Sequence, residues 1–154
     1  MPIAKVKAPV RATGDPTPLP TLGRPQAQKA PGIGISLNTL RRDSTGLVTL
    51  VWTVRNGGSD DLSLIDYFRD RSYQRTSTFV SGMTLVDETA KLRYNSVQIV
   101  PRKVCTCTDT AVVPSSISSG DSITLYNVFK LPTSVSNVTV DVPGWAPLKN
   151  VKIS

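Results

Sequence analysis

The stretch LVTLVWTVR, residues 47–55, has an apolar side chain at every second position from Val48 to Val54, with polar Thr49, Thr53 and Arg55 among the positions between and after them. A period of two residues is that of a β-strand with one face toward a core and the other toward solvent. The apolar side chains expected on the inner face are Val48, Leu50, Trp52 and Val54. Turn-forming residues precede the stretch at 43–46, DSTG, and follow it at 56–61, NGGSDD. The pattern predicts a half-buried strand between two turns.

Short apolar stretches separated by turn signals recur along the rest of the chain. We predict further strands within residues 33–40, 79–86, 92–100, 123–131, 138–142 and 148–153. Residues 63–68 are predicted to be a short edge segment, and no helix beyond a turn or two is expected. Seven or eight strands at this spacing predict an all-β protein, an antiparallel β-sandwich.

The first 31 residues differ in composition from the rest. They hold seven of the twelve prolines and no Phe or Trp. Proline lacks an amide donor and biases the residue before it away from helix, so this segment is predicted to be an extended coil. The predicted organisation is therefore a Pro-rich basic arm or linker at residues 1–31 and one β-sandwich domain at residues 32–154.

Much of the net charge of +7 belongs to this arm. Its basic residues, set against Asp15 alone, are Lys5, Lys7, Arg11, Arg24 and Lys29. A flexible basic arm can reach an anionic partner, and it is the one part of the chain where nucleic-acid contact is expected. The alternative is a solubilising linker.

A second basic group follows the predicted edge segment. Its members are Arg69, Arg71, Tyr73 and Arg75. Basic residues interleaved with aromatic ones resemble a polyanion-binding surface. Asp66 and Asp70 dilute the charge and favour a solvated loop instead.

The residues needed for most catalytic sites are missing from the sequence. Histidine is absent, which removes the commonest general base, the serine triad and most zinc and copper sites. Asp87 and Glu88 are adjacent, but neighbours on an extended chain point to opposite faces, so a hairpin turn is expected there. We predict no catalytic residue, no metal and no cofactor, and a protein that is not an enzyme.

The motif Cys105-Thr106-Cys107 allows three interpretations. Free thiols could bind Cu(I) or zinc, but two sulfurs without further ligands make an incomplete site. A redox pair would lack the helix N-terminus that activates a thiol. A disulfide needs a bend at Thr106, because residues two apart in a strand are separated by about 6.6 Å, near the upper limit for a bridge. We favour the disulfide, on condition that the chain is exported.

The start of the chain gives no direct sign of export. No run of eighteen apolar residues occurs, so no membrane-spanning helix is predicted. Lys5 and Lys7 are followed by prolines instead of the apolar core of a signal peptide. Either the protein is cytoplasmic, or Met1 stands where a signal peptide has been removed.

Five elements occur in a familiar order. They are residues 80–87, VSGMTLVD; 91–94, KLRY; 105–107, CTC; 119–122, SGDS; and 138–145, VTVDVPGW. This order resembles an immunoglobulin-like domain of exported actinobacterial proteins, often found beside a peptidoglycan-binding domain like that of outer membrane protein A. The resemblance covers residues 35–153, and that peptidoglycan-binding domain is missing here. It implies an immunoglobulin-like sandwich, an extracytoplasmic location and a non-catalytic role at the cell envelope.

Two functions follow as hypotheses. The first is an extracytoplasmic interaction or structural module that binds a protein or envelope partner through loops or a sheet edge. The second is a structural subunit of an assembly, such as a virion, phage tail or filament. In that case the basic arm would contact neighbouring subunits or nucleic acid.

Overall fold

The computed structural model describes residues 21–25, 32–69, 78–99 and 104–154. Most of these residues lie in antiparallel strands, and the helical part among them is the five-residue α1 (Leu64–Phe68). The all-β prediction is confirmed. Within the described residues, no helix has the length and apolar character needed to cross a membrane.

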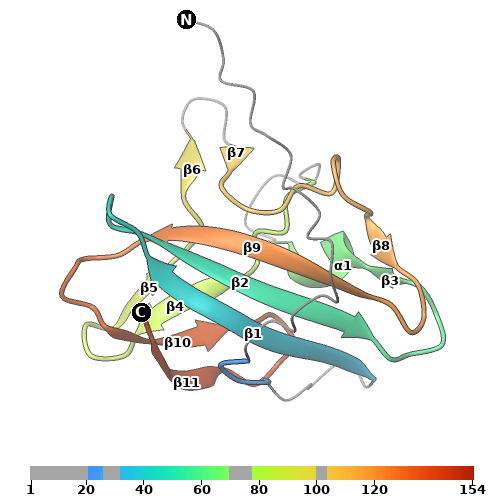
Figure 1. Ribbon diagram of the computed structural model, residues 1–154, viewed down its shortest axis with the longest axis horizontal. Helices are drawn as coiled ribbons and strands as arrows, with labels where there is room; N and C mark the ends of the chain where they lie inside the picture. Colours follow the sequence, from blue (N-terminus) through green and yellow to red (C-terminus); the bar gives the residue numbers. More distant parts are fainter. Residues whose placement is uncertain (1–20, 26–31, 70–77, 100–103) are drawn as a thin grey trace, which may run out of the picture.

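Three long strands make up the first layer (Figure 1). In the order in which they lie side by side, they are β1 (Ile33–Arg42), β2 (Leu47–Asn56) and β9 (Ser122–Lys130). All neighbours are antiparallel, with Leu50 of β2 opposite Leu40 of β1 and Asn127 of β9. The four apolar residues predicted on the inner face of β2 are all buried. The alternation at residues 47–55 therefore marks the central strand of this layer.

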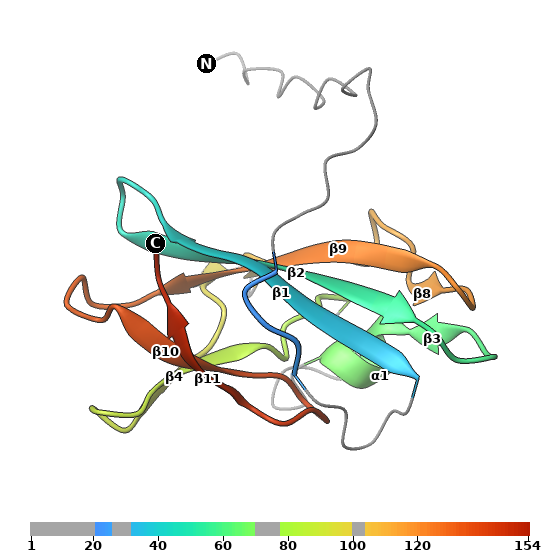
Figure 2. The same cartoon turned by 60° about the horizontal axis from the view of Figure 1, so that its bottom comes forward.

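The second layer packs against the first (Figure 2). Its strands, in spatial order, are β11 (Leu148–Lys152), β10 (Asn137–Asp141), β4 (Thr84–Asp87) and β5 (Leu92–Tyr94). Inward side chains of both layers form one apolar core, to which β2 contributes Trp52, β9 Phe129 and β10 Val140. Burying such side chains between two sheets is the main contribution to the stability of this architecture.

The remaining strands are only two residues long. They are β3 (Leu62–Ser63), β6 (Gln98–Ile99), β7 (Val104–Cys105) and β8 (Ser116–Ile117). They form the pairs β3–β8 and β6–β7. The described residues thus contain eleven strands, seven of them longer than two residues, where the sequence predicted seven or eight.

The segment 63–68 differs from its prediction as an extended edge. After Ser63, it forms the single helical turn α1, because the Ser63 hydroxyl accepts a hydrogen bond from the Asp66 amide at 3.4 Å and caps the turn. Leu64 and Phe68, four residues apart, then point into the same core. The Phe68 ring lies 5.1 Å from that of Trp52, in an edge-to-face arrangement.

Two predicted strands are shorter than the sequence suggested. Residues 79–86 were predicted as one strand, but β4 begins only at Thr84. The Gly82 amide donates to the Phe68 carbonyl at 2.6 Å, and a Cβ at this glycine would lie at the same distance from that oxygen. Residues 92–100 are divided into β5 and β6, because the Val97 amide turns away to bond the Val128 carbonyl of β9 at 2.8 Å.

Residues 22–23 and the C-terminal Ser154 lie along the outer edge of β1. The Leu22 amide donates to the Leu37 carbonyl, and the Leu37 amide donates to the Gly23 carbonyl. Further along the edge, the Ser154 amide donates to the Leu40 carbonyl at 2.9 Å, and the Arg42 amide donates to the Ser154 carbonyl at 2.8 Å. Part of the predicted arm, residues 21–25, therefore packs on the domain, whereas residues 1–20 and 26–31 lie outside the described residues.

Candidate functional site

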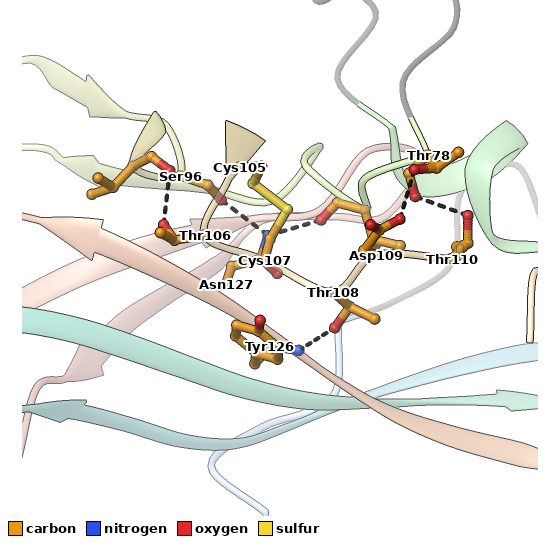
Figure 3. The surroundings of a disulfide bond; sticks show 12 residues. Thr78, Ser96, Cys105, Thr106, Cys107, Thr108, Asp109, Thr110, Tyr126 and Asn127 are labelled. Carbon is orange, nitrogen blue, oxygen red and sulfur yellow. Dashed lines mark hydrogen bonds between the residues drawn. A yellow bond between two sulfur atoms is a disulfide. The ribbon is translucent and has the colours of Figure 1, made fainter. Parts of the chain in front are cut away.

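Cys105 and Cys107 are joined by a disulfide at the end of β7 (Figure 3). Their Cα atoms are 5.3 Å apart, closer than in a straight strand, so the chain bends at Thr106 as a bridge requires. The two residues are only 7% and 2% exposed. The bridge is therefore a buried part of the structure.

Hydrogen bonds fix the bend on both sides. The Thr106 amide and hydroxyl both donate to the Val97 carbonyl, at 2.8 and 2.7 Å. On the other side, the Val128 amide of β9 donates to the Thr106 carbonyl at 2.9 Å. Since Val97 itself donates to Val128, the three segments close a ring of backbone hydrogen bonds. The disulfide segment thus continues the first layer beyond β9.

A buried asparagine lies directly beside the disulfide. Asn127 of β9 is paired with Cys107 and is completely buried. Its Oδ1 accepts from the Trp52 indole at 2.8 Å, while its Nδ2 donates to the Val80 carbonyl at 2.9 Å and the Ser96 hydroxyl at 3.0 Å. The Asn127 side chain therefore connects β2 to the segments of Val80 and Ser96, while its backbone pairs with the disulfide segment.

The sequence reasoning missed Asn127, although the sequence carries a signal. The inward positions of β9 are Leu125, Asn127 and Phe129, so a single amide interrupts an apolar alternation. A buried amide needs hydrogen-bonding partners, and such an interruption points to a polar connection inside the core. The identity of its partners could not be read from the sequence, because Trp52, Val80 and Ser96 are distant along the chain.

The chain after the disulfide is fixed by short hydroxyl side chains. Thr108 and Tyr126 exchange two bonds: the Thr108 amide donates to the Tyr126 carbonyl at 3.0 Å, and the Tyr126 amide donates to the Thr108 hydroxyl at 2.9 Å. The Thr78 hydroxyl donates to the Asp109 carboxylate at 2.6 Å, and the Thr110 hydroxyl donates to the Thr78 carbonyl at 2.8 Å. The first pair of bonds holds Thr108 against β9, and the second pair ties residues 109–110 to Thr78 (Figure 3).

Two large apolar side chains face solvent on the strands around this site. Tyr126 of β9 is 45% exposed, and Ile99 of β6 is 52% exposed. We call these two residues the β6–β9 surface. Aromatic side chains are enriched in protein interfaces relative to other surfaces. Because Tyr126 is hydrogen-bonded through its backbone on the side of the disulfide segment, its ring is presented from a fixed support.

The predicted basic sites are described only in part. Of the arm residues, Lys5, Lys7, Arg11 and Lys29 lie outside the described residues, while Arg24 is exposed next to Gly23. Of the loop group, Arg71, Tyr73 and Arg75 also lie outside them. Arg69 follows α1, partly buried, and its amide donates to the Ile65 carbonyl at 3.3 Å. A polyanion-binding role for either group stays a prediction.

The adjacent carboxylates Asp87 and Glu88 serve separate partners. Asp87 accepts from the amides of Thr89 and Ala90, at 3.0 and 3.2 Å, which is the usual arrangement of a turn. Glu88 accepts from the hydroxyl of Thr139 on β10 at 3.0 Å. Across the described ranges, no group of three or more His, Cys, Asp or Glu side chains could hold a metal ion.

Comparison with known proteins identified no relative of this chain. No family model, no curated protein and no solved structure matches the chain. A function for this protein is therefore argued from its own residues and contacts.

Proposed function

We propose that the protein is an exported, non-catalytic interaction or structural module with an immunoglobulin-like fold, acting at a bacterial cell envelope. The observation that carries the proposal is the buried Cys105–Cys107 disulfide. Disulfides form and persist in oxidising compartments and are rare in the cytosol. The motif order around this cysteine pair, which resembles that of exported envelope domains, agrees with the same location.

The strand order supports the immunoglobulin-like part of the proposal. The first layer has the order β1-β2-β9 and the second β11-β10-β4-β5. In immunoglobulin-like domains, the first, second and fifth strands share one sheet, while the third, sixth and seventh share the other. The same arrangement results if β1, β2 and β9 are the first, second and fifth strands. The third, sixth and seventh strands are then β4, β10 and β11. The disulfide segment beside β9 then takes the place of the fourth strand.

The β6–β9 surface is our candidate for the contact with a protein partner. Tyr126 and Ile99 together offer an aromatic ring and an aliphatic side chain to solvent. The disulfide and the ring of hydrogen bonds at Thr106 hold the strands that carry them, so little ordering is needed on binding. A preorganised surface of this kind binds more tightly than a flexible one of the same area.

The location can be tested by trapping thiols in intact cells that make the native protein. Alkylation before and after reduction measures the fraction of Cys105 and Cys107 that is bridged, and fractionation shows where the protein is. We expect a bridged pair in the extracytoplasmic fraction. Reduced cysteines in a cytosolic protein would contradict the proposal.

The partner can be tested by recovery from an envelope extract with the tagged full chain. Replacing Tyr126 by Ser should reduce recovery of the partner at least about tenfold, as for a central aromatic contact. The matched control is Tyr67→Ser, since Tyr67 is 38% exposed on α1, outside the β6–β9 surface. Equal recovery with both variants would exclude the β6–β9 surface as the contact.

A second candidate function is a structural subunit of an assembly. The observation that favours it is the pairing of residues 22 and 23 with the edge of β1. Extended arms of assembly subunits become ordered by adding to the edge of a sheet. Light scattering at ordinary ionic strength tests this function, and a monomer at every concentration would contradict it.

A further inference from the structure

The outer edge of β1 provides a short binding site for an extended peptide. We call this site, the backbone of Leu37 together with the side chain of Leu148, the seat. At this seat, Leu37 uses both of its backbone groups: its carbonyl accepts from the Leu22 amide at 2.6 Å, and its amide donates to the Gly23 carbonyl at 2.9 Å. The two segments run antiparallel. The arm therefore binds by strand addition, in which main-chain hydrogen bonds hold the peptide.

The second layer restricts which residue fits at this seat. A Cβ at Gly23 would fall against the side chain of Leu148 on β11, with Cδ1 at 3.2 Å and Cγ at 3.3 Å. Glycine is thus the residue that fits without displacing Leu148. Pro25 is buried two residues further on, whereas Leu22 is 48% exposed. The domain thus covers Gly23 in part and buries Pro25, and Figure 2 shows this segment in blue between β1 and β11.

The seat ends where the C-terminus begins to cover the same edge. Ser154 occupies the backbone groups of Leu40 and Arg42. Between the two covered parts, the pairing of β1 with β2 shifts register at Leu37 and Thr39. The seat is therefore short and lies apart from the stretch of the edge that Ser154 covers.

We propose that the seat also accepts residues 22–25 of a second copy, so that two copies associate by exchanging arms. The inference rests on the second candidate function, a structural subunit of an assembly. It adds the site on a neighbouring copy to which the arm binds. Every contact in the seat is made by residues 22–25 with the domain, so the same contacts form whether the segment comes from the same chain or from a neighbour. Exchange of an identical element costs little because no contact is lost.

The sequence between arm and domain favours such exchange. Pairing within one chain requires the backbone to reverse direction between Gly23 and Leu37, because the two segments are antiparallel. Pro25 and Pro31 lie in this interval, and each fixes its own φ and restricts the residue before it. Stiffness in this interval opposes closure of the segment onto its own domain, which favours exchange between copies.

A photo-reactive residue in place of Leu22 tests the proposal in the full chain. Leu22 is half-exposed, so benzoylphenylalanine fits there, next to the β1 edge. An equal mixture of ¹⁴N and ¹⁵N chains is equilibrated at concentrations from about 10 µM to about 1 mM, the range in which a free arm competes with a tethered one. After irradiation, cross-linked peptides are analysed by mass spectrometry.

Arm exchange predicts peptides that join position 22 of one isotope to the β1 edge of the other, with a fraction that rises with concentration. Introducing Gly23→Val should lower the yield of these peptides about fivefold, because the added side chain meets Leu148 and weakens the pairing by about 1 kcal/mol. The control is Gly34→Val, since a Cβ at Gly34 of β1 meets no atom within 4 Å. This control should leave the yield unchanged.

Cross-links confined to chains of one isotope would overturn arm exchange. Light scattering on the same samples measures the oligomeric state, so it distinguishes a failure of the arm-exchange proposal from a failure of the assembly function. Oligomers without mixed-isotope cross-links would contradict only the arm, whereas a monomer at every concentration would contradict both.

Discussion

The two edges of the first layer are covered in different ways. Along β1, the cover consists of residues 22–23 and Ser154, held by backbone hydrogen bonds at Leu37, Leu40 and Arg42. Along β9, it is the segment around Thr106, held by backbone hydrogen bonds to β9, by the Thr106 hydroxyl and by the Cys105–Cys107 bridge. An uncovered edge can pair with another chain, so both solutions prevent uncontrolled association. The cover of β9 includes a disulfide, whereas hydrogen bonds hold the cover of β1, so we expect the β1 edge to open more readily.

The largest effect is expected from removing the buried amide at the β9 edge. Asn127→Ala leaves the Trp52 indole and the Val80 carbonyl without their partner inside the core. An unsatisfied buried polar group costs about 1–3 kcal/mol, and the space left behind adds to that, so the free energy of unfolding should fall by about 2–4 kcal/mol. Urea denaturation measures the change.

Asn137→Ala is the matched control for this variant. Asn137 is exposed on β10 and makes one long bond to the Ser136 hydroxyl, at 3.4 Å. Its replacement should change stability by no more than about 0.5 kcal/mol. If the two asparagine variants lost equal stability, Asn127 would not have the connecting role described.

A smaller effect is expected from opening the disulfide. The bridge closes a very short loop, so replacing both cysteines by Ala should lower the free energy of unfolding by about 1–2 kcal/mol. The local effect should be greater than the global one, because the bend at Thr106 is then no longer held by a covalent bond. Hydrogen exchange should accelerate at the amides of Thr106 and Val128. Unchanged protection at both amides would show that hydrogen bonds alone hold the segment.

At the β1 edge, Gly23→Val should cost about 1 kcal/mol, the net value of one or two backbone hydrogen bonds. The added side chain meets Leu148 and releases residues 22–25 from the seat. The amide of Leu37 should then lose its protection from hydrogen exchange, whereas Gly34→Val should preserve it. Protection at Leu37 in the Gly23 variant would mean that something other than the arm covers this edge.

The smallest effect concerns the turn between β1 and β2. The Thr45 hydroxyl donates to the Asp43 carboxylate at 2.5 Å and lowers the pKa of Asp43, with help from nearby backbone amides. A lowered pKa in the folded state means stability that is present above the ordinary value of 3.8 and is lost as the pH falls through the folded value. Thr45→Val should therefore be less stable than the native chain at pH 6, and the difference should shrink toward pH 2. The same difference at both pH values would exclude the carboxylate as its cause.

Local alternation was enough to predict the strands that make up the core. Residues 47–55 carry an apolar side chain at every second position from Val48 to Val54 and form the central strand β2. The prediction failed at residues 63–68, where one serine cap and the spacing of Leu64 and Phe68 favour a helical turn over an edge strand. A single cap and one pair of apolar residues are weak evidence for a helix, so the apolar character of the segment favoured a strand. The packing of Phe68 against Trp52, which supports the helical turn, is visible only in the structure.

The contacts around the disulfide could be predicted only where the two partners are close together in the sequence. The two cysteines are separated by one residue, so their pairing and the bend at Thr106 could be anticipated. Asn127 connects to Trp52, 75 residues away, and the β1 edge pairs with Ser154 at the other end of the chain. Contacts of this kind depend on how the two layers meet, which the pattern of a single strand does not contain.

Hydrogen exchange on the unmodified full chain tests the contrast between the edges most directly. The two amides to compare are that of Leu37, which the arm covers, and that of Val128, which the disulfide segment covers. If the arm leaves its seat while the disulfide segment stays in place, the Leu37 amide should exchange at least about tenfold faster than that of Val128, after correction for intrinsic rates. Equal protection of the two amides would contradict the account, because the β1 edge would then be as firmly closed as the β9 edge.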